Sequence, residues 1–117
     1  MIEQYQQGKI TFTEQGEFFL AVYYAEKLIG CGVLQQQWNK NEKEHGIGCV
    51  NYFYLLPDYR QYGIGKKMLR YLEQHAICHF SALCLQTETT LASQFYQKMN
   101  YVFVENNPNY NYFKYLI

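Results

Sequence analysis

The chain has 117 residues, which is enough for one hydrophobic core and too few for two, so we expect a single domain spanning residues 1–117. Ten acidic residues balance ten basic ones, which argues against nucleic acid or an anionic membrane as a partner. Aromatic residues make up 19% of the chain, and this favours a core rich in β-structure.

The N-terminal part of the sequence predicts two strands after a weakly structured start. Residues 1–16 are polar and rich in Gln, so we expect either poor order or a short edge strand there. Residues 17–24 and 28–37 are rich in apolar and β-branched side chains and predict an antiparallel pair. Within the second strand, Gly30 and Gly32 indicate a bulge or a close backbone approach.

The middle of the chain predicts a loop, a buried strand and a helix. Residues 39–48 are charged and contain glycine, and we interpret them as a loop of about ten residues. Residues 49–56 are almost all apolar or aromatic, which is typical of a strand covered on both faces, and Pro57 ends it. Residues 66–76 contain no Gly or Pro and predict a helix. The apolar stripe of this helix has the spacing i, i+4: Ile64, Met68, Leu72 and Ala76.

The C-terminal part predicts a strand, a helix and two more strands. Residues 81–86 form a short buried strand, parallel to the preceding one if the helix between them is a right-handed crossover. Residues 91–99 carry an apolar helical face, and Asn100 follows where a left-handed residue ends a helix. Residues 101–105 and 110–116 predict the last two strands, so the whole order indicates an α+β fold with a mixed sheet and two crossover helices.

The turn between the buried strand and the first helix has the composition of a phosphate-binding site. Gly63 and Gly65 lie between the strand and the helix start, and glycine lets the backbone come close to an anion. The first amides of a helix lack intrahelical acceptors, and the helix dipole adds partial positive charge there. We therefore expect a phosphate-bearing cofactor at this turn.

The four cysteines show no CxxC pair, and four free thiols in a reducing cytoplasm are the simplest interpretation. The start of the chain has no pattern of a signal peptide, and no apolar run reaches the roughly 20 residues that a membrane span needs. We expect no metal. The alternative is a zinc site whose ligands would be His75, Cys78, His79 and Cys84.

Two segments resemble the GNAT superfamily of acetyl-CoA-dependent N-acetyltransferases. Residues 50–76 resemble its acyl-CoA-binding motif, a strand and a proline followed by Arg-x-x-Gly-x-Gly, here residues 60–65. Residues 92–101 are similar to a later helix of the family, Ala-x-x-Phe-Tyr followed by a glycine and an aromatic residue, although Asn100 stands where the glycine is usual. The resemblance implies a three-layer α/β arrangement of the α+β class, with a mostly antiparallel mixed sheet, a central splay and two main helices.

The resemblance also implies where acetyl-CoA, as the acyl-donor cosubstrate, would bind. The glycine turn would hold the pyrophosphate, and the main chain at the end of the buried strand would pair with the pantetheine arm. Thr89 stands where the family often has Asn. The cofactor-binding residues implied in this way are Leu55, Leu56, Arg60, Gln61, Tyr62, Gly63, Ile64, Gly65, Lys66, Thr89 and Phe95.

Catalytic roles follow from the same resemblance. The Leu55 amide would donate to the thioester carbonyl as in an oxyanion hole, and Tyr96 would protonate the departing thiolate, unless it is only part of the helix's apolar face. Many members place a basic Glu on the buried strand, but Asn51 stands there. The substitute bases are Glu44, His45 and Glu88.

The implied function is transfer of an acetyl group from acetyl-CoA to a primary amine of a small molecule or peptide. The alternative is a non-catalytic module of GNAT type that binds acyl-CoA. The usual N-terminal strand and helix pair of the family is largely absent before residue 17. A second subunit could complete the acceptor site, so a homodimer is possible.

Overall fold

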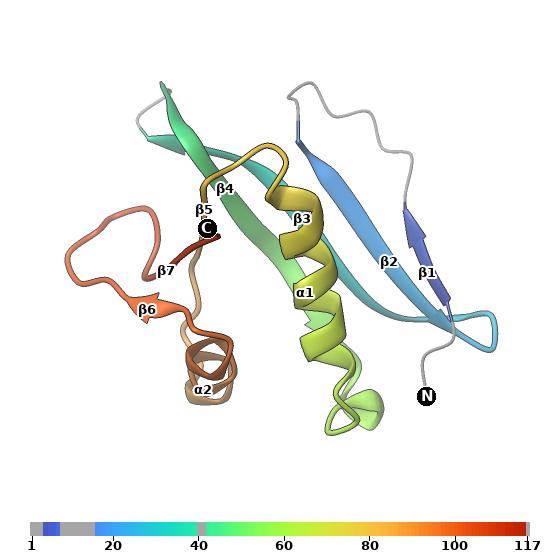
Figure 1. The fold of residues 1–117 in the computed structure, drawn as a ribbon. Helices are drawn as coiled ribbons and strands as arrows, with labels where there is room; N and C mark the ends of the chain where they lie inside the picture. The colour runs from blue at the N-terminus through green and yellow to red at the C-terminus, as the bar shows by residue number, and fades with distance from the viewer. Residues whose placement is uncertain (1–3, 8–15, 40–41, 117) are drawn as a thin grey trace.

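The computed structural model describes residues 4–7, 16–39 and 42–116, and shows an open mixed sheet with two α-helices (Figure 1). The helices are α1 (Ile64–Ala76) and α2 (Thr90–Lys98), and a short 3-10 helix covers Pro57–Tyr59. The strands are β1 (Gln4–Gln7), β2 (Phe18–Tyr24), β3 (Lys27–Asn39), β4 (Glu42–Leu55), β5 (Ala82–Leu85), β6 (Val102–Phe103) and β7 (Tyr112–Tyr115).

The seven strands lie in the order β1-β2-β3-β4-β5-β7-β6. Every neighbouring pair is antiparallel except β4 and β5, which are parallel and joined through α1. The predicted α+β class, the mostly antiparallel sheet and the parallel crossover are therefore confirmed. Within residues 1–16, Gln4–Gln7 form the edge strand β1, while residues 1–3 and 8–15, including most of the stretch with strand-like alternation, lie outside the described residues.

The predicted loop over residues 39–48 is wrong. β3 and β4 continue past the body of the sheet as a long hairpin, and residues 40–41 between them are outside the described part. The amide of Gln36 supports this arm by donating to the carbonyl oxygens of Glu44 at 2.9 Å and Ile47 at 3.3 Å. Gly48 is required by packing, since a Cβ there would lie 2.7 Å from the Phe80 ring. The charged residues of this segment thus belong to a partly solvated strand, and Gly48 marks a packing contact within it.

The middle of the sheet splays open beside β4. β4 and β5 pair only from Ile47–Cys49 to Ala82–Cys84, yet β4 runs on to Leu55. A bulge interrupts the β3–β4 register in this stretch, and Tyr52 takes a left-handed φ of 52°. Bulges bend a strand and increase its twist, so β4 turns away from its partner beyond Cys49. The central splay is confirmed.

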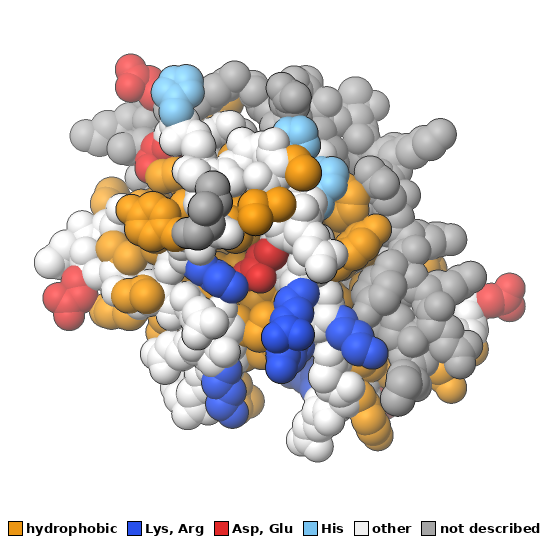
Figure 2. Space-filling view, viewed as in Figure 1, with side chains coloured by type: hydrophobic (Ala, Val, Ile, Leu, Met, Phe, Trp, Pro, Cys, Tyr) orange, Lys and Arg blue, Asp and Glu red, His pale blue; other side chains and the backbone are white. Residues whose placement is uncertain are grey.

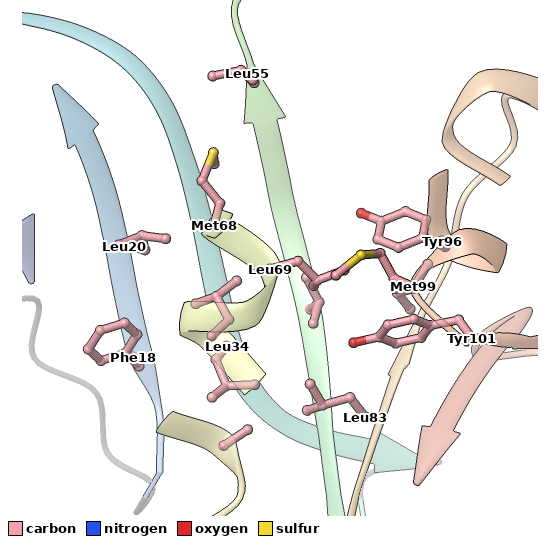
Figure 3. Close-up of a cluster of buried hydrophobic side chains, with 14 of the residues drawn as sticks. Phe18, Leu20, Leu34, Leu55, Met68, Leu69, Leu83, Tyr96, Met99 and Tyr101 are labelled. Carbon is pink, nitrogen blue, oxygen red and sulfur yellow. The ribbon is translucent and has the colours of Figure 1, made fainter. Parts of the chain in front are cut away.

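Helix α1 fills one face of the sheet through its predicted apolar stripe. Ile64, Met68, Leu69, Leu72 and Ala76 are all buried, and Figure 3 shows the central ones packed among side chains of β2, β3 and β5. The helix comes close because two glycines of β3 lie under it. A Cβ at Gly30 would meet the Met68 methyl at 3.1 Å, and one at Gly32 would meet Leu72 at 3.0 Å. These glycines mark the close approach that the sequence predicts.

Helix α2 has the ends that its sequence predicts. The Thr89 hydroxyl accepts a hydrogen bond from the Ala92 N–H at 3.2 Å as an N-cap, and Asn100 has a φ of 73° just beyond the helix. α2 joins the same core as α1 through Tyr96. Just beyond α2, the Tyr101 hydroxyl donates to Glu73 of α1 at 2.7 Å. No helix in the described part of the chain is long and apolar enough to span a bilayer.

Candidate functional site

The open edge of β4 directs the backbone of Leu55 into the splay. The Leu56 N–H donates to the Ile29 carbonyl of β3 at 2.8 Å. Since backbone polar groups of successive strand residues point to opposite edges, the N–H and C=O of Leu55 face away from β3. β5 does not pair with β4 at this level. The Leu55 N–H is therefore directed where an extended ligand could lie along β4 as an added strand.

Arg60 fixes the peptide that carries this amide. Its Nε donates to the Leu55 carbonyl oxygen at 2.8 Å, and its guanidinium lies over the Tyr54 ring, 5.3 Å from the centroid. A charge-assisted bond and a stacking contact together hold the end of β4 against the following turn. Arg60 was predicted to contact a cofactor, and in the structure its described contacts are with β4.

The start of α1 presents unpaired backbone donors. Gly63 is the N-cap, with a φ of 76°, and the first turn has neither a side-chain cap nor an acidic residue. A Cβ at Gly63 would meet nothing within 4 Å, so the space before these amides is open. Gln61 also has a left-handed φ of 76°, and such alternations curl N–H groups into an anion-binding concavity. This turn fits a pyrophosphate.

Basic side chains lie on the exposed face of this helix. Lys66, Lys67 and Arg70 of α1 are exposed, and Figure 2 shows Lys and Arg side chains gathered on the face of the molecule that α1 occupies. Of the other residues predicted for the cofactor, Ile64 is buried and offers only its backbone, while Tyr62 is exposed. The Thr89 hydroxyl is engaged as the cap of α2.

The side of the splay formed by α2 is aromatic. Phe95 and Tyr96 of α2 lie 6.0 and 6.2 Å, centroid to centroid, from the Phe53 ring of β4. Figure 3 shows Tyr96 directed from α2 toward β4. Tyr96 is 6% exposed, and its burial raises the pKa of the hydroxyl above the ordinary value. Tyr96 is thus a protonated donor at neutral pH, and it is also part of the core.

The structure separates the three candidate bases. Glu44 and His45 lie in the hairpin arm, ten or more residues along β4 from Leu55, which is roughly 30 Å at the rise of a strand. They are too far away to accept a proton at Leu55. Glu88 follows the end of β5, across the splay from the second half of β4, where Gln86 donates to it at 2.7 Å. Of the three, only Glu88 borders the splay.

Asn51, which stands at the position of the expected carboxylate, is held in a side-chain network. Its amide donates to Gln35 Oε1 at 2.6 Å, and its oxygen lies 3.4 Å from Cys49 Sγ. Cys84 is the partner of Cys49 in the β4–β5 register, and a hydrogen bond from Cys84 lowers the pKa of the Cys49 thiol. This polar cluster lies on the sheet face opposite α1, since Val50 faces the core.

Asn111, a residue that the sequence analysis missed, shapes the splay from the β5 side. Its side chain accepts from the Thr87 N–H at 3.0 Å and donates to the Thr87 carbonyl at 2.7 Å, which holds the chain leaving β5 toward β7. An asparagine in a predicted strand carries no signal of this role.

The zinc alternative is not supported. His75 stacks on Phe18 with centroids 4.1 Å apart, while Cys84 is fully buried beside Cys49. Among the residues that the structure describes, no three potential ligands come together as a metal site.

The comparisons with known proteins agree with this geometry. Residues 14–103 match the protein family described as the acetyltransferase (GNAT) domain, which is most of the chain. No curated protein matches its sequence.

Solved structures share the fold. A protein of Exiguobacterium sp. 255-15 assigned as an acetyltransferase is 23% identical with a TM-score of 0.76, over 89% of this chain and 66% of that one. A GNAT-family acetyltransferase of Streptococcus pneumoniae is 20% identical with a TM-score of 0.64, over 86% of this chain and 67% of that one. The Bacillus subtilis N-acetyltransferase YlbP, in complex with coenzyme A, is 15% identical with a TM-score of 0.64, over 83% of this chain and 66% of that one. The chain thus spans about two thirds of their length, and at these identities the likeness concerns the fold alone.

Proposed function

The chain belongs to the acetyltransferase (GNAT) family, and we propose that it transfers an acetyl group from acetyl-CoA to a primary amine by direct attack. The family supports acyl transfer in general. The choice of acetyl-CoA, of an amine acceptor and of the residues below is our proposal.

One observation carries it: the Leu55 amide faces an unpaired strand edge between an uncapped helix start and a buried tyrosine. Pantetheine contains two amides and is the kind of extended chain that can pair with such an edge. The backbone donors at the start of α1 are suited to the pyrophosphate. The coenzyme A in the YlbP structure supports acyl-CoA as the ligand of this arrangement.

The chemistry then follows from the two walls of the splay. The acceptor nitrogen attacks the thioester carbonyl carbon, and the developing oxyanion is stabilised by the Leu55 N–H. As the tetrahedral intermediate collapses, the carbon–sulfur bond breaks and the CoA thiolate takes the Tyr96 proton. Because burial keeps Tyr96 protonated, the donor is in the correct state before attack.

The acceptor must reach the site as a free amine. Glu88 is the base that we propose, acting through water from its place across the splay. It accepts the proton that the attacking nitrogen, positively charged in the tetrahedral intermediate, loses as the amide forms. Its hydrogen bond from Gln86 orients the carboxylate.

The test is CoA release from acetyl-CoA over a panel of amines, with acetyl-CoA binding measured separately by calorimetry. We expect saturable binding and amine-dependent release, both lost in Gly63→Glu, which places a side chain and a negative charge in the turn. Absence of binding at millimolar acetyl-CoA would refute the proposal.

A binding module without catalysis is the second candidate, and Asn51 favours it because the expected carboxylate of β4 is missing. Binding of acetyl-CoA with no amine-dependent release from any acceptor would decide for this candidate.

A further inference from the structure

Two of the four free cysteines face each other across the sheet. Cys49 of β4 and Cys84 of β5 are partners in the parallel register, so their side chains lie on the same face. Neighbouring strands lie about 4.8 Å apart, which is within the roughly 4.4–6.8 Å between Cα atoms that a disulfide spans. A hydrogen bond joins the two thiols. The backbone spacing and the contact between the sulfur atoms therefore allow a disulfide here.

The two thiols differ in their access to solvent. Cys49 is half-buried and lines a polar hollow of about 340 Å3 on the sheet face opposite α1, together with the side-chain amides of Gln35 and Asn51. Cys84 is fully buried and does not occur among the described residues that line this hollow. A small reagent that enters the hollow therefore meets the Cys49 sulfur, while the Cys84 sulfur lies behind it.

The two thiols also differ in how readily they ionise. The hydrogen bond from Cys84 lowers the pKa of the Cys49 thiol, although burial opposes this effect. The same hydrogen bond, together with burial, raises the pKa of Cys84. Because the thiolate is the nucleophilic form of cysteine, Cys49 is suited to attack an electrophile, with a protonated Cys84 beside it.

We propose that Cys49 and Cys84 form a reversible disulfide when a hydroperoxide enters the hollow, so that the pair is a peroxide-responsive modification site. The Cys49 thiolate attacks the peroxide and the O–O bond breaks. Sulfenic acid forms on Cys49, and the departing oxygen takes a proton and leaves as an alcohol or water. The Cys84 sulfur then attacks the Cys49 sulfur. The S–OH bond breaks, and hydroxide leaves as water with the Cys84 proton. Two thiols are oxidised and one peroxide is reduced.

The position of the pair determines what the disulfide connects. Cys49 and Cys84 form the last rung of the short parallel pairing between β4 and β5, and the splay begins directly beyond them. A disulfide there fixes the two strands to each other at the root of the splay. No step involves acyl-CoA, so the inference does not depend on the proposed function.

The test is oxidation with hydrogen peroxide, followed by intact mass measurement and peptide mapping. The wild-type monomer should lose two hydrogen atoms and two of its four thiols, with the new link between Cys49 and Cys84. Dithiothreitol should restore both thiols. Cys49→Ser should leave Cys84 reduced. The matched control Cys78→Ser removes an exposed thiol after α1 and should leave the link between Cys49 and Cys84 intact.

A trapping experiment separates the two roles. In Cys84→Ser the sulfenic acid on Cys49 has no thiol beside it, so it should persist and be captured by dimedone, whereas the wild type should give little adduct. Cys84→Ala should give the same adduct, and circular dichroism shows whether each variant folds.

Three results would overturn the inference. The first is a Cys49 that stays reduced in excess peroxide, and the second is a disulfide that joins Cys31 or Cys78 instead. The third is equal dimedone labelling of Cys49 in the wild type and in the folded Cys84 variants, which would show that Cys84 does not react with the sulfenic acid.

Discussion

Gly63 offers the sharpest test of the phosphate-binding turn, because the protein and the ligand need glycine there for different reasons. Its φ of 76° lies in the left-handed region, where an Ala costs roughly 1–2 kcal/mol. Steric crowding does not contribute to this cost, since a Cβ at Gly63 would meet nothing within 4 Å. Gln61 tolerates the same φ two residues earlier. We therefore expect Gly63→Ala to lower the free energy of unfolding by about 1–2 kcal/mol, and Gly63→Asn by less, because Asn tolerates this conformation.

The effect on cofactor affinity should not follow the effect on stability. Both variants place a Cβ in the open space before the first amides of α1. The loss of charge-assisted hydrogen bonds worth about 1.5–3 kcal/mol would weaken acetyl-CoA binding roughly ten- to a hundredfold in each. Urea denaturation gives the stability and calorimetry the affinity. Wild-type affinity in Gly63→Asn would show that glycine serves only the turn, and the phosphate assignment would be wrong.

Three further predictions concern Tyr96 and Asn111, on the side of the splay formed by α2 and β5. Tyr96→Phe should lower kcat about a hundredfold while the acetyl-CoA affinity changes little; equal losses in both would indicate a packing role. Asn111→Ala removes both hydrogen bonds to Thr87 and should lower the free energy of unfolding by about 1–3 kcal/mol, whereas an unchanged denaturation midpoint would contradict its role in holding β5. Burial raises the folded-state pKa of Tyr96 above the unfolded value of about 10. Its contribution to stability is therefore complete below about pH 10 and falls as the pH rises further. The free energy of unfolding should decline less steeply above pH 10 in Tyr96→Phe than in the wild type, and parallel slopes would argue against the shift.

The cofactor side of the site could be predicted because it is local in sequence. A strand, a proline, a glycine turn and a helix follow one another within residues 50–76, and local patterns of this kind specify their own backbone. The left-handed Asn100 and the Thr89 cap were predictable for the same reason. The apolar face of the helix that carries Tyr96 was also predictable, because its apolar residues recur at helical spacing.

The remaining features depend on contacts between segments far apart in the chain. The hairpin arm of β3 and β4 resembled a loop because much of it is solvated. Its Gly48 is explained only by Phe80 packing from beyond α1, and its Gly46 by a left-handed φ of 78°. The prediction of Glu44 as a base followed from that error, since a loop over these residues could have folded back toward the site. The role of Asn111 depends on Thr87, 24 residues earlier.

The central claim is that acyl-CoA lies along the open edge of β4 with its phosphates at the start of α1. Backbone amide chemical shifts recorded during titration with acetyl-CoA test this most directly. We expect saturable shifts that are largest at Leu55 and at Ile64, Gly65 and Lys66. Largest shifts at β6 and β7, or no saturable change at millimolar ligand, would contradict it.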